Sequence, residues 1–155
     1  MLFDMSKRVV IKDKGWKEIK KRFPELDGAG VKVGVTADAG SYTGGVSLAL
    51  VAAVLHYGRD GSVKKWPFIR NGIAKGKSKL DKLRIDLIKQ YITNSASLDT
   101  LLNKLGLLGK SLIQKEIKTV TSPALSETTT LRKKSTKPLI DTGQLLNSID
   151  YEVKK

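Results

Sequence analysis

Residues 138–153 read Pro-Leu-Ile-Asp-Thr-Gly-Gln-Leu-Leu-Asn-Ser-Ile-Asp-Tyr-Glu-Val, and a helix signal is followed there by a strand signal. Pro138 interrupts what precedes it, and Asp141 or Thr142 offers a side-chain oxygen to cap a short helix. Apolar and acidic residues then alternate with the period of a half-buried strand, whose inward face is Ile149, Tyr151 and Val153. We therefore predict that residues 139–155 form a closing helix and strand.

Upstream of this stretch, helix and strand signals alternate. Helical spacing of apolar residues predicts a basic helix over 14–23 that ends at Pro24, a mostly buried helix over 46–57, and helices over 74–93 and 98–120. Alternation predicts a strand at 31–35, and Pro67 favours an extended segment over 63–70. Two glycines inside the last helix, Gly106 and Gly109, weaken it and allow close packing.

Two segments have the composition of loops. Residues 36–45 are rich in glycine and lack large apolar side chains, and residues 121–138 are rich in Thr, Ser and Lys. We expect both to be mobile in the isolated subunit. The predicted fold is a single α+β domain over 1–155, with a basic N-terminal helix region at 1–24 and a small, mostly antiparallel sheet packed against several helices.

Composition excludes several classes of protein. A chain of 155 residues fits one domain with a real core, and the lack of cysteine rules out disulfides and thiolate chemistry. One histidine cannot form a His-rich zinc site within a subunit. We see neither a signal peptide nor an apolar run long enough to cross a bilayer, so we expect synthesis in the cytoplasm and no membrane contact.

The net charge of +14 is unevenly distributed. Residues 1–24 contribute +5, residues 64–93 contribute +7 and residues 94–155 contribute +4, whereas residues 25–63 contribute −2. Such a charge attracts polyanions or an acidic protein face. It fits nucleic acid or an acidic protein as a partner.

The segment 138–153 resembles the C-terminal signature of small tailed-phage morphogenesis proteins of the neck, tail-completion and minor tail group. That signature is a proline, apolar residues, Asp-Thr-Gly, a short helix and a strand, in that order. A second similarity is Ala-Ala-Val-Leu-His-Tyr-Gly at 52–58 followed by Lys-Trp-Pro-Phe-Ile-Arg at 65–70, where the family has an Ala-Arg-Pro-Phe element. Trp66 stands where the arginine of that element often lies. The two similarities span about two-thirds of the chain.

The resemblance implies a mechanical role. Similar proteins form rings, commonly of six subunits, between the capsid connector and the tail. It therefore implies a homo-oligomeric ring as partner, contacts with portal or connector and with tail tube or tail terminator proteins, and non-specific contact with passing DNA. The expected location is the virion head–tail junction or tail, after assembly in the host cytoplasm. It implies no enzyme activity and no cofactor.

Two groups of residues are the candidates for contacts in such a ring. The interface residues are Tyr42, Gly44 and Gly45 in the first loop and Arg132, Lys133, Lys134 and Lys137 in the second. The expected core and sheet anchors are Trp66, Phe68, Ile149, Tyr151 and Val153. Trp66 and Phe68, which lie among cations, also fit a nucleic-acid stacking platform, but burial in the core is the commoner use of such residues. The second loop likewise fits either a DNA grip or a solvated segment that orders against a neighbour.

Other motifs predict no chemistry. His56 and Tyr57 end an apolar helix, where a capping or packing histidine is far commoner than a catalytic one. Residues 40–45 lack the Lys-Ser/Thr ending of a P-loop. Asp81 and Asp86 pair with lysines of their own helix, whereas Asp141 and Asp150 serve as a cap and an exposed strand residue.

Two alternatives to the phage protein stay open. The first is a small basic nucleic-acid-binding protein, although the cations of residues 75–89 are spread around their helix rather than gathered on one face. The second is an enzyme such as a virion hydrolase, for which the sequence offers no catalytic constellation.

Overall fold

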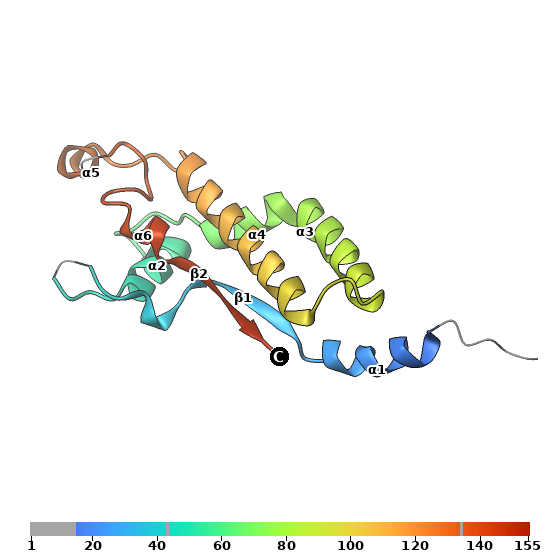
Figure 1. The fold of residues 1–155 in the computed structure, drawn as a ribbon. Helices are drawn as coiled ribbons and strands as arrows, with labels where there is room; N and C mark the ends of the chain where they lie inside the picture. Colours follow the sequence, from blue (N-terminus) through green and yellow to red (C-terminus); the bar gives the residue numbers. More distant parts are fainter. Residues whose placement is uncertain (1–14, 43, 134) are drawn as a thin grey trace, which may run out of the picture.

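The computed structural model describes residues 15–42, 44–133 and 135–155. In chain order its elements are α1 (Trp16–Leu26), β1 (Gly30–Val35), the 3₁₀ turn η1 (Ala37–Ala39), α2 (Leu48–Tyr57), α3 (Phe68–Ile92), α4 (Leu98–Thr119), α5 (Glu127–Arg132), α6 (Gln144–Asn147) and β2 (Ile149–Lys154). This is the predicted α+β fold in a single chain. Figure 1 shows an elongated molecule, with α1 at one end and α5 at the other.

The sheet joins the two predicted strands. β1 and β2 are antiparallel, and Val31, Val33 and Val35 lie opposite Val153, Tyr151 and Ile149. These residues belong to the less exposed face, while Lys32, Asp150 and Glu152 between them are exposed to solvent. The alternation of apolar and polar residues therefore predicted both strands correctly. The apolar face packs on α4.

Glycines set how closely the layers approach. α3 and α4 are antiparallel neighbours, and a Cβ on Gly76 would lie 2.3 Å from Cδ1 of Leu112. On the other side of α4, a Cβ on Gly109 would lie 2.9 Å from Cγ2 of Val33. The close packing expected from the glycines within α4 is confirmed.

Two clusters of buried side chains form the core. One brings Phe68 and Trp66 together with Ile113, Ile117, Leu139, Leu145 and Ile149, and includes Ala52 of α2. The other lies towards α1 and contains Leu87, Tyr91, Leu101 and Leu102, with Val153 packed against it. Of the predicted anchors, Trp66, Phe68 and Ile149 are core residues and Val153 packs against the second cluster, whereas Tyr151 is only half-buried and belongs to neither cluster. Phe68 is the first residue of α3 and Trp66 lies just before it, so neither lies on a strand.

Several element boundaries differ from the predictions. Residues 63–70 are not one extended segment, because α3 begins at Phe68 with Pro67 as its N-cap. Proline fixes its own φ and disfavours helix for the residue before it, but it does not restrict the residues that follow, so the helix can start directly after Pro67. α1 continues past Pro24 to Leu26, since its last turn is closed by a hydrogen bond from Asp27 N–H to Pro24 O. α2 begins at Leu48 and buries only Leu48, Ala52 and His56, so the prediction of a mostly buried helix is wrong.

The closing segment also has a different cap. The helix before β2 is a single turn, α6, and its N-cap is Gly143 with φ 82° and no side-chain cap. The prediction that Asp141 or Thr142 caps it is wrong, because the positive φ at Gly143 is a conformation that favours glycine. Residues 121–138 are not loop throughout, since Ser126 caps α5 by accepting from Thr129 N–H.

Candidate interaction surfaces

The first candidate loop turns tightly at its glycines. Gly44 and Gly45 have φ values of 108° and 82°, which other residues rarely adopt. Tyr42 N–H donates to Val46 O at 2.8 Å, and Gly45 N–H donates to Tyr42 O at 2.9 Å. The turn leaves Tyr42 half-buried while Gly44 and Gly45 are exposed. Of the three predicted interface residues in this loop, Gly44 and Gly45 are therefore exposed to a partner and Tyr42 is only partly so.

The second candidate loop is attached to the body at several points. Trp66 Nε1 donates to Pro123 O at 2.9 Å, and Lys64 Nζ donates to Ala124 O at 2.8 Å. Lys133 is half-buried, with its Nζ donating to Pro138 O at 2.7 Å, whereas Lys137 is exposed. The side chain of Arg132 and all of Lys134 lie outside the described residues. Lys137 is thus the described cation of this loop that is available to a partner.

The carboxylate of Asp141 influences the pKa of one residue in each candidate loop. Burial raises the pKa of Tyr42 and the Asp141 carboxylate raises it further, while a backbone hydrogen bond at Leu145 lowers it. Burial lowers the pKa of Lys133, and the same Asp141 carboxylate opposes that shift. One carboxylate just before α6 therefore acts electrostatically on a residue of each loop. Asp141 was predicted as a cap, and nothing in its sequence position signalled this shared role.

Trp66 and Phe68 are buried, with exposed fractions of 5% and 1%. The indole N–H of Trp66 is already used by Pro123 O, and Trp66 N–H donates to Leu55 O at 2.8 Å. A base cannot stack on rings that the core covers. The burial alternative is confirmed for both residues.

His56 packs among aromatic rings. Its ring lies edge-on to Phe68 at 5.5 Å and to Tyr57 at 4.8 Å between centroids. Burial lowers the pKa of His56, and Arg70 and then Lys65 lower it further. Its Nδ1 is buried and makes no hydrogen bond to the described residues. A histidine kept neutral by burial and cations fits the packing role that the sequence favoured.

The outer face of α2 is an apolar surface that the sequence reasoning missed. Leu50 and Tyr57 are 58% and 74% exposed, and Val46, just before the helix, is 47% exposed. Ala53 lies between them and is also exposed. We call these four residues the α2 ridge. The sequence held a signal for the three helical members, because Leu50, Ala53 and Tyr57 follow one another at intervals of three and four residues, the spacing of one helix face.

A second exposed apolar stripe lies on α1. Trp16 and Phe23 are 58% and 50% exposed, with Ile19 between them at helical spacing. α1 contains no buried residue. The C-terminal half of α1 makes hydrogen bonds to the rest of the molecule. Arg22 donates to Tyr91 O and Asn94 Oδ1, and the Tyr91 hydroxyl donates to Glu25 Oε2 at 2.5 Å.

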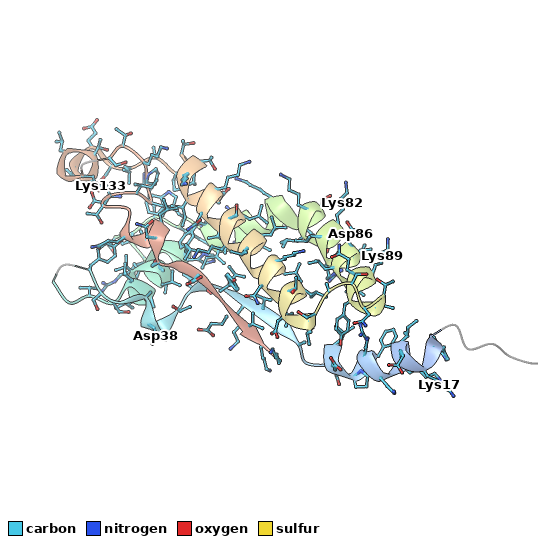
Figure 2. All side chains as sticks on the ribbon, in the orientation of Figure 1. Lys17, Asp38, Lys82, Asp86, Lys89 and Lys133 are labelled. Atoms are coloured by element: carbon cyan, nitrogen blue, oxygen red, sulfur yellow. The ribbon has the colours of Figure 1, made fainter. Side chains whose placement is uncertain are left out.

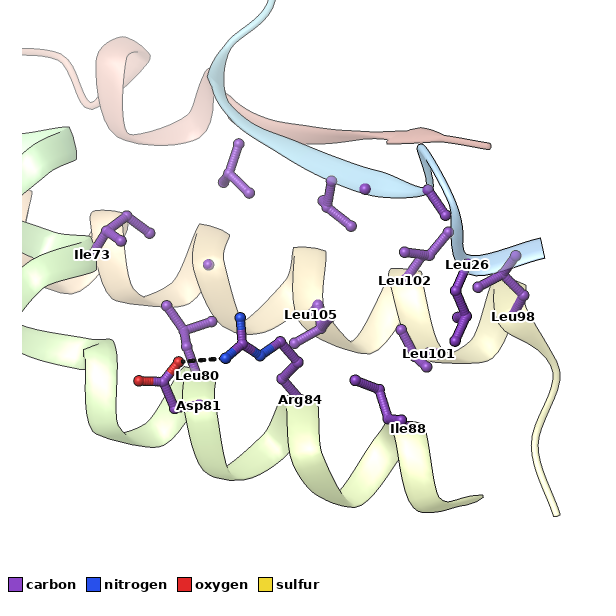
Figure 3. Close-up of a pocket in the computed structure, with 15 residues that line it drawn as sticks. Leu26, Ile73, Leu80, Asp81, Arg84, Ile88, Leu98, Leu101, Leu102 and Leu105 are labelled. Carbon is purple, nitrogen blue, oxygen red and sulfur yellow. Dashed lines mark ion pairs between the residues drawn. The ribbon is translucent and has the colours of Figure 1, made fainter. Parts of the chain in front are cut away.

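An apolar groove lies between β1, α3 and α4 and has a volume of about 420 Å³. Figure 3 shows Ile73, Leu80 and Ile88 of α3 facing Leu101, Leu102 and Leu105 of α4 across it. The charged side chains at its edge are Asp81 and Arg84, which pair with each other at 3.4 Å. A groove of this kind suits an apolar occupant rather than a reaction that needs acid–base groups.

The cations of α3 are partly engaged in ion pairs. Lys75 Nζ contacts both carboxylate oxygens of Glu116 at 2.7 and 2.8 Å, and Lys77 pairs with Asp81 at 2.8 Å. Lys82 and Lys89 are exposed on the side of α3 that points away from the sheet (Figure 2). Asp81 pairs within its own helix, as predicted, and Asp150 pairs instead with Lys110 of α4 at 3.0 Å.

In the described ranges, no three His, Asp or Glu side chains gather closely enough to hold a metal ion. Among the helices that the structure describes, none combines the length and hydrophobicity needed to cross a bilayer. Comparison of the chain with models of known protein families found no match, and no curated protein or solved structure matched it.

Proposed function

We propose that this chain is a structural protein of the head–tail junction of a tailed phage or prophage, of the neck or tail-completion type. It assembles as a ring of identical subunits, commonly six in the proteins it resembles, between the capsid connector and the tail. Its role is mechanical and requires no cofactor. Portal or connector proteins on one side and tail tube or terminator proteins on the other are its partners.

The observation that carries the proposal is that the two similar segments meet in one core. Trp66 and Phe68, from the mid-chain similarity, share a buried cluster with Leu139, Leu145 and Ile149 from the C-terminal one. The two segments lie far apart in the sequence but belong to one signature. Because their side chains pack together in one cluster, we expect the segments to serve one structural purpose. Here that purpose is to fix α6 and β2 onto the start of α3, which supports reading the two similarities as one pattern.

The loop residues supply contacts that a ring needs. The Asp141 carboxylate acts electrostatically on both Tyr42 and Lys133, and Gly44, Gly45 and Lys137 of the same two loops are exposed. Such segments can become ordered against a neighbouring subunit or the next ring. The net charge of +14 favours an acidic neighbour or DNA passing through the ring.

A small nucleic-acid-binding protein is the second candidate, favoured by the exposed lysines of α3 and by the net charge. The burial of Trp66 and Phe68 weighs against it, because it removes the aromatic platform that the sequence offered. Binding through lysines alone would be non-specific and strongly dependent on salt.

The test of the proposal is removal of the coding sequence from the phage or prophage that carries it. Electron microscopy of the lysate should show complete heads and tails that are not joined, or tails of abnormal length. A gene carried outside any phage genome, or normal virions after the deletion, would overturn the proposal.

Light scattering of the purified protein separates the two candidates. We expect a mass that is unaffected by duplex DNA at physiological salt, whether the species is a monomer or a ring. Tight and strongly salt-dependent binding of DNA by a monomer or dimer would favour the nucleic-acid-binding protein instead.

A further inference from the structure

The side of the α3–α4 pair that points away from the sheet is rich in exposed lysine. Four lysines of α3 and two of α4 lie on it, and we call them the hairpin face: Lys75, Lys79, Lys82, Lys89, Lys104 and Lys115. The members on α3 follow one another at intervals of four, three and seven residues, and those on α4 are about three turns apart. Such spacing keeps each set on one side of its helix.

Two observations place both sets on the same side of the molecule. A narrow hollow between the helices is lined by Lys75 and Lys79 of α3 and by Lys115 of α4, and it shares no residue with the groove beside the sheet. In Figure 2, Lys82 and Lys89 point away from the sheet. The lysines of the two helices therefore form one surface.

Ion pairs divide the cations of residues 75–89 between this surface and the sheet side. Lys77 and Arg84 pair with Asp81, which lines the groove beside the sheet. On the hairpin face, Lys75 pairs with Glu116, and the other five lysines make no ion pair with a described residue. The cations of this segment that have no described carboxylate partner therefore share one side of α3.

Carboxylates are few on this surface. Asp86, four residues after Lys82, is exposed there, and Glu116 is buried in its contact with Lys75. The exposed face of the sheet is balanced instead, because its charged residues are two lysines and two carboxylates: Lys32, Lys154, Asp150 and Glu152. The excess of positive charge therefore lies on the helical side of the fold.

The chemistry of the hairpin face favours the phosphates of a duplex over other polyanions. A protein partner needs an apolar or aromatic centre, but the exposed large apolar residues of the two helices are Ile85 and Leu107 alone. A single strand stacks its bases on exposed rings, whereas both aromatic residues of α3, Phe68 and Tyr91, are buried and α4 has none. Lysine side chains by themselves suffice to bind the backbone of a duplex.

We propose that the hairpin face binds the phosphate backbone of duplex DNA without sequence preference. Its lysines on α3 extend over about 21 Å of helix, and the same length of duplex carries about twelve phosphate charges. The inference rests on the proposed function, in which DNA passes through the ring, and it names the surface that meets this DNA.

Binding by a single subunit should be weak at physiological salt. If about five lysines each neutralise one phosphate, the association constant falls about a thousandfold between about 30 and 150 mM salt. A face of this kind can guide DNA through a ring without holding it. It also agrees with a mass in light scattering that duplex DNA leaves unchanged at physiological salt.

The test is fluorescence anisotropy of a labelled DNA duplex of about 20 base pairs, titrated with the full-length protein from about 30 mM salt upwards. The double variant Lys82→Gln/Lys89→Gln should bind at least about tenfold more weakly at low salt, and its slope of log affinity against log salt should be smaller by about 2. The variant Lys82→Arg/Lys89→Arg keeps both charges and should bind as the parent does.

The matched control is Lys32→Gln/Lys154→Gln, which removes the same charge from the exposed face of the sheet. It should keep the salt slope of the parent. Equal losses in the two glutamine variants would show attraction by net charge rather than by the hairpin face, and would overturn the inference.

Two further results would overturn the inference. The first is a parent protein that does not bind the duplex at low salt. The second is binding of poly-glutamate at least as tight as that of the duplex, which would assign the face to an acidic protein. None of these results decides the proposed function, because that is judged by the virions made after gene deletion.

Discussion

The ring of Tyr151 on β2 lies directly over Gly106 of α4. A Cβ built on Gly106 would lie 2.2 Å from Cδ2 of Tyr151. The ring is held in place at its far end, where the Tyr151 hydroxyl donates to Asn103 Oδ1 at 3.0 Å. The missing side chain at Gly106 is therefore what lets the closing strand pack closely on α4.

We expect Gly106→Ala to destabilise the protein. Alanine favours a helix over glycine by about 1 kcal/mol, but overpacking a core contact costs about 1–3 kcal/mol. The net effect should be a lower free energy of unfolding, by about 1 kcal/mol, in urea denaturation. Ser111→Ala, at an exposed position of the same helix, is the control and should have little effect. A Gly106→Ala variant as stable as the parent would show that moving Tyr151 aside costs no more than the gain of about 1 kcal/mol in helix propensity.

Lys75→Met should destabilise the protein more than Lys77→Met. The side chain of Glu116 is only 5% exposed and Lys75 is its cation, so its loss leaves a buried carboxylate without that partner. Because Lys75 itself is 67% exposed, we expect about 1–2 kcal/mol rather than the full cost of a buried pair. The pair of Lys77 with Asp81 is more exposed, and its loss should cost less than about 0.5 kcal/mol.

Chemical denaturation of both variants measures this difference. The double variant Lys75→Met/Glu116→Gln removes the carboxylate charge and should recover part of the lost stability. If the two lysine substitutions lowered the free energy of unfolding equally, the burial of Glu116 would not make its pair with Lys75 more important than the pair of Lys77 with Asp81.

Stability should fall as the pH drops through the range in which histidine titrates. Burial, Arg70 and Lys65 lower the pKa of His56 in the folded protein, so the unfolded chain takes up its proton at the higher pH. The stability is thus fully present above the unfolded pKa of about 6.5 and is lost below it, until the folded pKa is reached. Melting temperatures at pH values from about 8 to 5 test this, with His56→Gln as the variant whose profile should be flatter. An identical pH profile for both proteins would exclude His56 as the cause.

The loops at 36–45 and 121–138 should exchange their amide hydrogens faster than α3 and α4 in a verified monomer. Apart from the short helix α5, their described backbone is held by a few hydrogen bonds, such as Tyr42 N–H to Val46 O, rather than by a long helix. Hydrogen exchange followed by mass spectrometry measures this, and protection of both loops equal to that of α4 would contradict it. Assembly into a ring should then slow their exchange.

Local patterns in the sequence predicted most of the fold. Alternation marked both strands and helical spacing marked α3 and α4, because their apolar faces pack as the patterns require. The extended segment predicted over 63–70 from Pro67 was wrong. Proline disfavours helix for the residue before it but can itself precede a helix, and α3 starts at Phe68. The exposure of the α2 ridge could not be predicted from composition. An apolar segment is expected to be buried, but its sequence does not say whether its own subunit or another molecule covers it.

The influence of Asp141 on both loops had no local signal in the sequence. Asp141 lies far in sequence from Tyr42, and only the completed fold brings its carboxylate to act on both Tyr42 and Lys133. Residues that only the tertiary structure brings near one another cannot be predicted from their spacing in the sequence, because neither the helical nor the strand period relates them.

The register of the sheet has a consequence for the order of folding. Gly30 pairs with Lys154, more than a hundred residues later, so β1 has no partner strand until residues 149–154 have been made. α3 and α4, by contrast, are sequence neighbours separated by a short turn, and local contacts form before distant ones. We expect the helical hairpin to form early and the sheet to close late, which pulse-labelled hydrogen exchange would show as delayed protection of the β1 amides. Until then the valines of β1 are open to other chains, so newly made protein at high concentration is at its most vulnerable to aggregation before β2 arrives.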